Sequence, residues 1–570
     1  MSPAPALDRT ALDLAVADLR DHAATWTATP LPERIALLER MLPRIAAGAP
    51  ETVADAARAK GYGAESVWAA EDWVTAPWAL AQTVSAYLHV LRRLAAGRDP
   101  VAAKAVRDRD GRTVVDVFPA TTSDRLLLNG FTAEVWTLPG TTREQVLARA
   151  AGQYRGGASS PCVALVLGAG NVPAITPLDV LHKLYAEGQV VLAKMNPVNA
   201  YLRPHFEKVF TEFVDRGWVR FVDGGAEEGA YLTAHGGVDT IHVTGSERTH
   251  DAIVWGTDEQ AEQRRREDTP LNDKPFTSEL GGISPCIVAP GPWSAADFRY
   301  QAEHIVTSKM NNSGHNCVAS QILLVPRHWN GTERLLTEIR RVLSELPPRT
   351  DYYPGASDRL DAVTRAHPEA EAMGGGNCRL LVPDITDEDD PMLTAEVFAS
   401  ALGVVRLPGD DASQFLRAAT EFANDKLPGT LGATLLVHPG THRAHRAAVD
   451  GAITALRYGT LGVNCWSAFG FLLGYTPWGA HPGHTRQEIG SGIGFVHNAF
   501  MLGDVEKTVL RAPFAPAPRG LFTGSPSLSP RPPYFVTNRT GRTTMERLTA
   551  YTTDPRATRL PGIFASALRG

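Results

Sequence analysis

The sequence predicts an α/β protein that is built from parallel sheets and has more than one domain. Its 570 residues exceed what a single hydrophobic core normally organises. From residue 162 onward, short apolar runs alternate with helical patterns, which is typical of parallel strands joined by crossover helices. Residues 113–137 are rich in β-formers but broken by polar residues, as in a two-stranded ribbon. We therefore expect two parallel-sheet α/β domains and a small β-ribbon.

The individual elements follow from residue periodicity. Residues 1 to about 105 carry helical patterns, with Ile35, Leu38, Leu42 and Ile45 at the spacing of one helix face. The ribbon follows in two runs, and a further helical pattern covers 141–154. The runs expected to be strands are 113–118, 126–138, 162–167, 190–194, 219–222 and 240–243, and the expected helices between them are 176–186, 202–216 and 227–235. Charged residues dominate 258–274, which predicts an exposed insertion.

Composition argues against several classes of protein. The net charge is −6 with a pI near 6.3, so there is no basic footprint for nucleic acid and no polybasic anchor. Residues 1–14 lack a basic region followed by an apolar one, so we expect no signal peptide. No apolar run approaches the roughly 18 residues of a membrane span. We therefore expect no nucleic-acid partner and no membrane partner.

The cysteines predict a reducing location and no metal site. They are an odd, scattered set without CxxC spacing, which fits neither a disulfide framework nor zinc. Free thiols fit the cytoplasm, and we expect a cytoplasmic protein. The five are Cys162, Cys286, Cys317, Cys378 and Cys465.

A thiol and a carboxylate stand on Gly-flanked loops beside predicted strands. Cys317 lies in Ser-Gly-His-Asn-Cys-Val-Ala-Ser before the apolar run 321–325. Glu279 lies in Ser-Glu-Leu-Gly-Gly before the apolar run 286–288. Such a pair suits covalent catalysis on a carbonyl, in which the thiol attacks and the carboxylate later activates water. The alternative for Cys317 is an inert buried thiol, and for Glu279 a carboxylate that binds turn amides.

Two turns in the first α/β region indicate a nucleotide site. Gly168-Ala-Gly-Asn-Val-Pro173 nearly matches the fingerprint G-x-G-x-x-G, but Pro173 replaces its third Gly. The next strand ends in Lys194, where the fingerprint would have Asp or Glu; this Lys could bind ribose hydroxyls or a 2′-phosphate, or it could be a solvated strand end. Thr244-Gly245-Ser246 opens a predicted helix whose amides could receive a pyrophosphate.

Taken in order, the motifs resemble the aldehyde dehydrogenase superfamily over roughly residues 30–512. The spacing from Asn171 to Lys194, 194 − 171 = 23 residues, is also what we expect of that family. The set consists of Gly170-Asn171-Val172-Pro173, Lys194, Thr244-Gly245-Ser246, Glu279-Leu280-Gly281-Gly282, Cys317, Glu396-Val397-Phe398, Gly462-Val463-Asn464 and Pro477-Trp478-Gly479.

The resemblance implies roles for the matched residues. Cys317 is expected to be the nucleophile and Glu279 the general base. The side-chain amide of Asn171 and the backbone N–H of Cys317 are expected to form the oxyanion hole, although Asn171 could also be an ordinary turn residue before a Pro. The residues expected to bind NAD or NADP are Lys194 at the adenosine ribose, Gly245 and Ser246 at the pyrophosphate, Glu396 at the nicotinamide ribose and Phe398 near the nicotinamide, together with Gly281.

The resemblance also implies an architecture of two Rossmann-like parallel-sheet domains plus a β-ribbon that serves oligomerisation. We expect a homodimer or homotetramer. The expected division is an N-terminal helical part of the nucleotide-binding domain (1–112), the ribbon (113–140), the nucleotide-binding α/β domain (141–280), the catalytic α/β domain (281–480), a return to the nucleotide domain and ribbon (481–512), and a Pro-rich C-terminal extension (513–570). The extension could cover a subunit edge or the substrate entrance.

Several departures from the family pattern bear on specificity. Pro197 stands where the family has an acidic residue three positions after the ribose Lys, and its absence favours NADP because a 2′-phosphate meets less repulsion. His315 replaces a common Gln, and we expect it to pack or hydrogen-bond locally. The stretch 464–478 is aromatic, which predicts an apolar or aromatic aldehyde substrate or, alternatively, a core segment.

The sequence thus predicts NAD(P)-dependent oxidation of an aldehyde to a carboxylic acid through a thiohemiacetal and a thioester on Cys317. One alternative is an acyl-CoA reductase or CoA-acylating aldehyde dehydrogenase, which would not need Glu279 as a hydrolytic base. A second is a non-catalytic family member, against which Cys317, Asn171 and Glu279 argue. A Rossmann alcohol dehydrogenase built on Gly168 and Gly170 would not need Cys317.

Overall fold

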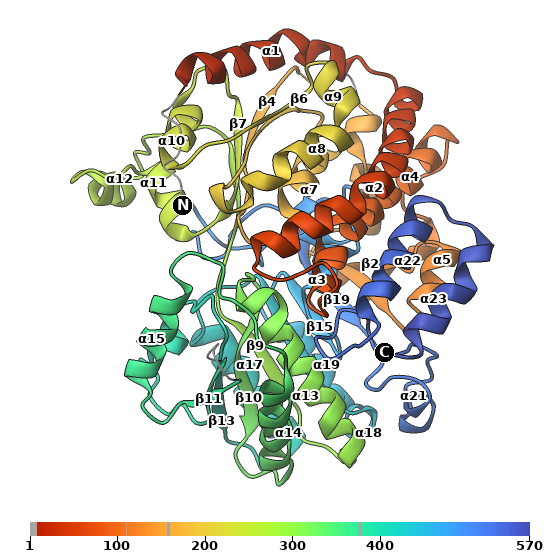
Figure 1. Ribbon diagram of the computed structural model, residues 1–570, viewed down its shortest axis with the longest axis vertical. Coiled ribbons are helices and arrows are strands. Elements are labelled where there is room, and N and C mark those ends of the chain that lie inside the picture. Colours follow the sequence, from red (N-terminus) through yellow and green to blue (C-terminus); the bar gives the residue numbers. More distant parts are fainter. Residues whose placement is uncertain (1–7, 110, 157–159, 375–378) are drawn as a thin grey trace.

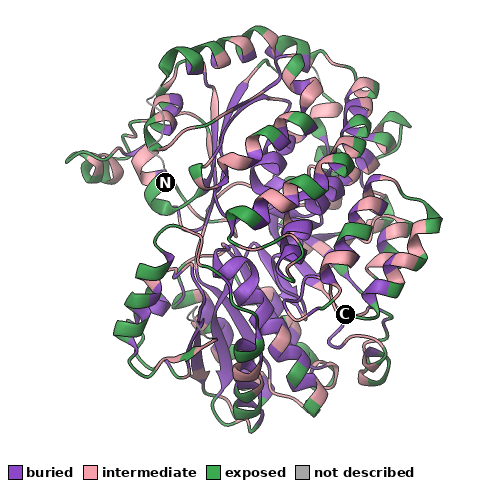
Figure 2. Ribbon diagram, viewed as in Figure 1, coloured by how far each residue is buried: buried purple, intermediate pink, exposed green. Residues whose placement is uncertain are grey.

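The computed structural model describes residues 8–109, 111–156, 160–374 and 379–570. The predictions for residues 1–7 and for Cys378 lie outside this part of the chain. The described residues form a six-stranded and an eleven-stranded sheet flanked by helices, so the predicted α/β class is confirmed (Figure 1). Figure 2 shows that the strands of both sheets are buried, while the surrounding helices expose their outer faces.

The six-stranded sheet has the strand order β17-β8-β7-β4-β5-β6. Its first five strands along the chain run parallel, and β17 joins β8 antiparallel. β4 lies between β7 and β5, so the strand order reverses there, and ligands bind at such a point in open α/β sheets. The strands are β4 (Val163–Leu167), β5 (Val190–Lys194), β6 (Val219–Val222), β7 (Thr240–Gly245), β8 (Phe276–Leu280) and β17 (Gly492–Ile493).

Helices connect these strands as the sequence predicted. The charged segment between β7 and β8 forms the exposed helix α12 (Ala261–Glu267), which projects from the molecule in Figure 1. The other connections are α7 (Ile175–Leu181) with its π-helical continuation (His182–Ala186), α8 (Arg203–Val209), α9 (Thr211–Asp215), α10 (Ala226–Ala234) and α11 (Glu247–Val254).

The N-terminal region forms four helices, as its periodicity predicted. They are α1 (Arg9–Thr27), α2 (Leu31–Ala59), α3 (Ala69–Trp73) and α4 (Ala79–Ala95). Helix α1 packs on the six-stranded sheet, and α2 packs on α3 and α4. Trp26 of α1 is fully buried and its ring packs on Tyr185 and Trp218, with centroids 5.5 and 5.1 Å apart. This aromatic contact fixes α1 against the sheet.

The eleven-stranded sheet has the order β1-β2-β3-β19-β15-β14-β9-β10-β13-β12-β11. Its parallel part carries the second α/β region. That part contains β9 (Ser284–Val288), β10 (Ser320–Pro326), β12 (Arg379–Val382), β13 (Ala401–Leu407), β14 (Gly432–Leu436) and β15 (Thr460–Val463), and the edge strand β11 (Glu371–Met373) joins β12 antiparallel. The helices around it are α13 (Ala295–Met310), α14 (Gly331–Glu345), α15 (Ala356–Ala366), α16 (Pro391–Thr394), α17 (Ala412–Asp425), α18 (Pro439–Ala444), α19 (Arg446–Ala455) and α20 (Phe469–Leu472).

The ribbon differs from the two strands that we predicted. It starts earlier, with β1 (Val106–Arg109), and continues through β2 (Arg112–Phe118) and β3 (Thr132–Thr137) into β19 (Val505–Arg511) of the large sheet. Three of the four residues in β1 are charged, so no apolar alternation marked it as a strand. The start of the predicted run 126–138 is instead helical, because Thr121 and Asp124 form a capping box for α5 (Thr122–Leu127).

The C-terminal extension folds back onto the molecule (Figure 1). It forms α21 (Arg519–Thr523), α22 (Gly541–Thr553) and α23 (Leu560–Ala567), and α22 packs on α2, α3 and α4. The remaining short elements are α6 (Arg143–Arg149), β16 (Pro477–Trp478) and β18 (Val496–His497). Across the described ranges, we find no helix with the length and apolar character that a bilayer crossing requires.

Candidate active site

The predicted thiol and carboxylate meet although they come from different sheets. Cys317 lies on the loop between the 3₁₀ turn Asn311–Gly314 and β10, and it is half-buried. Glu279 is the fourth residue of β8 in the six-stranded sheet and is buried. The distance from Cys317 Sγ to Glu279 Oε1 is 3.7 Å. The thiol can therefore donate directly to the carboxylate.

The surroundings of Glu279 adjust its proton affinity. Its Oε1 also accepts a hydrogen bond of 2.5 Å from Nε1 of Trp478, whereas Oε2 is buried without a partner among the described residues. Burial and the nearby charge of Asp179 raise the pKa of Glu279 to about 8, against the lowering effect of the Trp478 hydrogen bond. A carboxylate with such a pKa can accept a proton near neutral pH.

The thiol of Cys317 does not ionise on its own. Burial, followed by the charges of Glu279 and Glu396, raises its pKa well above the usual range. Of the two partners, Glu279 therefore loses its proton first, and its carboxylate is the group available to deprotonate the thiol.

An apolar cavity opens at this pair. It is bordered by Cys317, Glu279, Asn311, Asn316 and a wall of aromatic side chains. The aromatic stretch predicted for the substrate mouth supplies much of that wall, whereas Tyr475 lies elsewhere, against Phe500. The aromatic residues that line the cavity are Trp466, Phe469, Phe471, Trp478 and Tyr534.

Asn171 touches the loop of Cys317, but it does not line this cavity. Its Nδ2 donates to the backbone oxygen of His315 at 3.2 Å. Asn312 holds the same two residues together, since its Nδ2 donates to the backbone oxygens of Asn171 and His315, both at 2.9 Å. Asn316, directly before Cys317, does line the cavity. Its Oδ1 accepts from the Val318 N–H at 3.1 Å.

Sequence reasoning missed the supports of the Cys317 loop. Asn312 has φ 54°, a left-handed conformation that Asn tolerates better than most residues, and the Asn-Asn-Ser-Gly run was the only signal. Its backbone N–H donates to Oε2 of Glu71 on α3 at 3.0 Å. Glu71 in turn pairs with the buried Arg349 at 2.7 Å. No local pattern indicates these two, because their partners are far away in the chain.

The predicted ribose-binding Lys lies at the carboxyl edge of the six-stranded sheet. Nζ of Lys194 donates to the backbone oxygens of Gly224 and Gly225, both at 2.8 Å, just beyond β6. The side chain is buried, and burial lowers its pKa to about 8. The alternative of a solvated strand end is therefore wrong.

Gly245 and Ser246 lie at the same edge and are both exposed. Gly245 ends β7, and Ser246 is the N-cap of α11, where its Oγ accepts from the Thr249 N–H at 3.3 Å. A Cβ added at Gly245 would meet no atom closer than 3.6 Å. The backbone here leaves room for an anionic group at the start of the helix.

Gly281 and Glu396 are in contact. A Cβ at Gly281 would lie 2.2 Å from Oε2 of Glu396, so only Gly fits beside this carboxylate. Burial raises the pKa of Glu396 to about 8, against the opposing charge of Lys309. Lys309, a buried residue of α13 that sequence reasoning missed, has its own pKa lowered by burial to about 7.

Phe398 packs in an aromatic cluster. Its ring centroid lies 5.1 Å from that of Tyr353 and 5.7 Å from that of His315. Nδ1 of His315 lies 2.8 Å from the backbone oxygen of Phe398. The prediction that His315 packs and hydrogen-bonds locally is confirmed.

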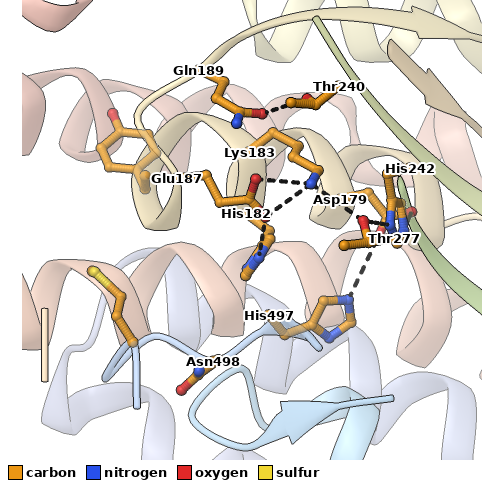
Figure 3. Close-up of polar contacts among 12 residues, drawn as sticks. Asp179, His182, Lys183, Glu187, Gln189, Thr240, His242, Thr277, His497 and Asn498 are labelled. Atoms are coloured by element: carbon orange, nitrogen blue, oxygen red, sulfur yellow. Dashed lines mark hydrogen bonds and ion pairs between the residues drawn. The ribbon is translucent and has the colours of Figure 1, made fainter. Parts of the chain in front are cut away.

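A buried polar network surrounds Asp179, whose charge acts on Glu279; Figure 3 shows this network. Asp179 of α7 is fully buried and accepts from Thr244 Oγ1 at 3.3 Å, with Nε2 of His242 3.5 Å away. Thr277 Oγ1 joins His242, at 2.9 Å, to Lys183, at 3.4 Å. This network supplies the charge that raises the pKa of Glu279.

The fold and the site define a class of protein. The sequence profile of the aldehyde dehydrogenase family matches residues 160–362, a segment that contains Asn171, Lys194, Glu279 and Cys317. This segment belongs to the aldehyde dehydrogenase family, and the resemblance expected from the motifs is confirmed.

Individual relatives are distant. The chain is 23% identical over 226 residues to 4,4'-diaponeurosporen-aldehyde dehydrogenase of Staphylococcus aureus, and 29% identical over 182 residues to N-succinylglutamate 5-semialdehyde dehydrogenase of Sphingopyxis alaskensis. These alignments cover 40% and 32% of this chain but only 45% and 34% of the relatives, so the chain spans less than half of each.

Solved structures share the fold over most of the chain. The substrate-bound Staphylococcus aureus AldH has a TM-score of 0.58 at 17% identity, covering 88% of this chain and 93% of that one. Glyceraldehyde-3-phosphate dehydrogenase from Methanocaldococcus jannaschii, complexed with NADP, has a TM-score of 0.58 at 14% identity, with 89% and 96% covered. The chain therefore has the aldehyde dehydrogenase fold.

Proposed function

We propose that this protein oxidises an aldehyde to a carboxylic acid with NAD or NADP, through covalent intermediates on Cys317. The observation that carries the proposal is the 3.7 Å contact between Cys317 Sγ and Glu279 Oε1 at the wall of an apolar cavity. A thiol beside a carboxylate whose pKa is about 8 has both the nucleophile and the base that this chemistry requires.

The residues at the carboxyl edge of the six-stranded sheet fit a dinucleotide. Lys194 brings a buried ammonium group to the end of β5, and the open backbone of Gly245 and Ser246 lies at the start of α11. Glu396 lies against Gly281, which is in the segment that links β8 to β9. We propose that these groups and Phe398 hold the cofactor. When bound, its nicotinamide ring supplies the acceptor for a hydride.

The chain's own residues carry the remaining chemistry. Glu279 takes the thiol proton, and Sγ of Cys317 forms a bond to the carbonyl carbon, which moves charge to the aldehyde oxygen. The C=O bond then re-forms as the carbon's hydrogen leaves with its electron pair, and a thioester remains on Cys317. Glu279 then releases the thiol proton to solvent, so that its carboxylate can take a proton from a water, which attacks the thioester carbon. The C–S bond breaks, Glu279 returns its proton to the thiolate of Cys317, and the acid is released.

The oxyanion needs hydrogen-bond donors near Cys317. We propose the backbone N–H of Cys317 and the amide of Asn171, with Asn316 as an additional candidate because it lines the cavity. Losing one such donor raises the barrier by about 3 kcal/mol in comparable sites. Comparing Asn171→Ala with Asn316→Ala assigns the role, since the variant that lacks the true donor has the lower kcat.

We propose that NADP is preferred. Pro197 offers no carboxylate near Lys194 that would repel a 2′-phosphate. Arg203 contributes less, because it already pairs with Glu207 at 2.8 Å and with Asp223 at 2.9 Å. A higher kcat/KM with NADP than with NAD is the expected result, and Pro197→Glu should reverse the order.

The test is an aldehyde panel with both cofactors on the wild type, Cys317→Ser and Glu279→Gln, with Cys162→Ser as a control for thiol loss outside the site. The wild type and Cys162→Ser should reduce the cofactor, and Cys317→Ser should lose nearly all turnover. Glu279→Gln should show a slower burst, because its thiol lacks a base, and then stall in deacylation. If added CoA releases this stall, the CoA-acylating alternative is correct. Failure of the wild type with every aldehyde would support a non-catalytic protein.

Assembly and location are further proposals. The ribbon ends in β1, and an edge strand can pair with a strand of another subunit. We propose a homodimer or homotetramer formed through this ribbon, to be checked by light scattering on the purified protein. The four cysteines in the described residues are free, in keeping with the proposed cytoplasmic location.

A further inference from the structure

The C-terminal extension lines a second apolar cavity. None of the described side chains that line this cavity carries a charge. The extension contributes residues from both its Pro-rich segment and its two last helices. Those residues are Ser529, Pro530, Pro532, Pro533, Tyr534, Thr544, Met545, Leu548, Ile563, Phe564 and Ala567.

The second cavity adjoins the cavity at Cys317. Val74, Phe469, Leu472 and Tyr534 line both spaces, so these four side chains form the wall between them. The rings of Phe469 and Tyr534 pack with centroids 5.8 Å apart. The carboxylate and amide side chains that line the first cavity are those of Glu279, Asn311 and Asn316. The second cavity has none among the described residues, and its polar groups are the hydroxyls of Ser529, Thr544 and Tyr534 and the indole of Trp78. The lining is therefore more apolar in the second cavity than beside the thiol.

The extension is a fixed wall of this cavity. Ser527 Oγ donates to the backbone oxygen of Asn129 at 2.9 Å, beside the ribbon. The Val536 N–H donates to Thr307 Oγ1 on α13 at 3.1 Å, and the ring of Phe535 stacks on Tyr300 with centroids 5.3 Å apart. Bonds to both the ribbon and the catalytic region hold Tyr534 in place between them.

We propose that the extension supplies the distal part of the substrate site, which receives the apolar chain of a long-chain aldehyde, with Tyr534 at the neck between the two cavities. The aldehyde group lies at Cys317 and its chain passes Tyr534 into the second cavity. This inference rests on the proposed function for its substrate class. It assigns the extension to the substrate site rather than to a subunit edge.

The test is kcat/KM for straight-chain aldehydes from propanal to dodecanal, on the wild type, Ala567→Trp and Leu568→Trp. Ala567 lines the second cavity, whereas the neighbouring Leu568 is 67% exposed, so Leu568→Trp is the matched control. In the wild type and the control, kcat/KM should rise about fourfold per methylene until the cavity is full. Ala567→Trp fills the cavity and should lower kcat/KM for decanal by about tenfold or more, with propanal unchanged.

Binding of decanoate and butanoate, measured by calorimetry on the same variants, separates this inference from the proposed function. If no aldehyde is oxidised but decanoate binds the wild type tightly and Ala567→Trp weakly, the cavity stands and the catalytic proposal fails. A flat chain-length profile with equal binding of both acids overturns the inference. It is also overturned if kcat/KM depends on chain length only in Tyr534→Ala, because the second cavity would then be closed to substrate in the wild type. If Ala567→Trp does not fold, Leu548→Trp replaces it, since Leu548 also lines the cavity.

Discussion

The ionisation of Glu279 should set the pH dependence of the proposed deacylation step. Two neighbours act in opposite directions on its pKa of about 8. The charge of Asp179 raises this pKa, and the hydrogen bond from Trp478 lowers it. Replacing each neighbour separately should move the pKa of Glu279 in opposite directions. Asp179→Asn should lower it and Trp478→Phe should raise it.

The size of the effect follows from the pKa. At pH 6 about 1% of a group with this pKa is ionised, and at pH 8 about half is, so the deacylation rate should rise about tenfold per pH unit before it levels off. Removing a nearby like charge typically lowers the pKa of a buried carboxyl group by about one unit, which corresponds to about 1.4 kcal/mol. The rising limb in Asp179→Asn should therefore lie about one pH unit lower than in the wild type.

The assay is single-turnover hydrolysis of the acyl-enzyme between pH 6 and pH 10. Thr277→Val is the matched control, because Thr277 belongs to the same network and bonds His242 but does not contribute to the pKa of Glu279. The control should retain the wild-type limb. If Asp179→Asn and Trp478→Phe retain it as well, Glu279 is not the group that titrates, and its assignment as the base is wrong.

Three further outcomes follow from the geometry. Gly281→Ala should displace Glu396 and weaken NADPH binding about tenfold, measured by fluorescence titration, with no change if Glu396 does not contact the cofactor. Glu71→Gln should reduce the free energy of unfolding in urea by about 3 kcal/mol, because Arg349 would keep a buried charge without a partner. Glu279→Gln should raise the unfolding temperature, and this gain should be absent below pH 4.5 and grow up to about pH 8. The reason is that the pKa of Glu279 in the folded protein exceeds the usual 4.5, so the stability of the wild type falls as the pH rises through this window.

The parallel-sheet elements could be predicted because their signals are local. The predicted bounds of β5 and β6 match the structure, since each is a short apolar run beside a helical pattern. β1 could not be predicted in this way, because it is an edge strand of mostly charged residues. Its strand character comes from pairing with β2, a contact that residue periodicity does not reveal.

The same distinction applies to the site. Cys317 and Glu279 were predicted because each stands in a Gly-containing segment beside an apolar run, and the structure brings them together. The predicted loop position of Glu279 is wrong, because this residue lies within strand β8. Asn312, Glu71 and Asp179 were missed, because their roles depend on partners more than 60 residues away in the chain. The extension was predicted as a Pro-rich wrap, but its contribution to a cavity depends on where its last helices pack.

The position of Glu279 ties the site to the joint between the two sheets. Glu279 lies near the end of β8 in the six-stranded sheet, and the chain then crosses through Gly281 to β9 of the other sheet, where Cys317 lies on the loop before β10. The return strand β17 fixes this crossing: Gly492 pairs with Glu279, and Ser491 Oγ donates to the Gly281 oxygen at 3.0 Å. The thiol and the carboxylate are held by different sheets. We therefore expect a change that separates the sheets to lengthen the 3.7 Å distance between Cys317 Sγ and Glu279 Oε1 before it unfolds either sheet. Loss of Ser491, which touches neither reacting group in the proposed chemistry, should therefore reduce turnover through this distance alone.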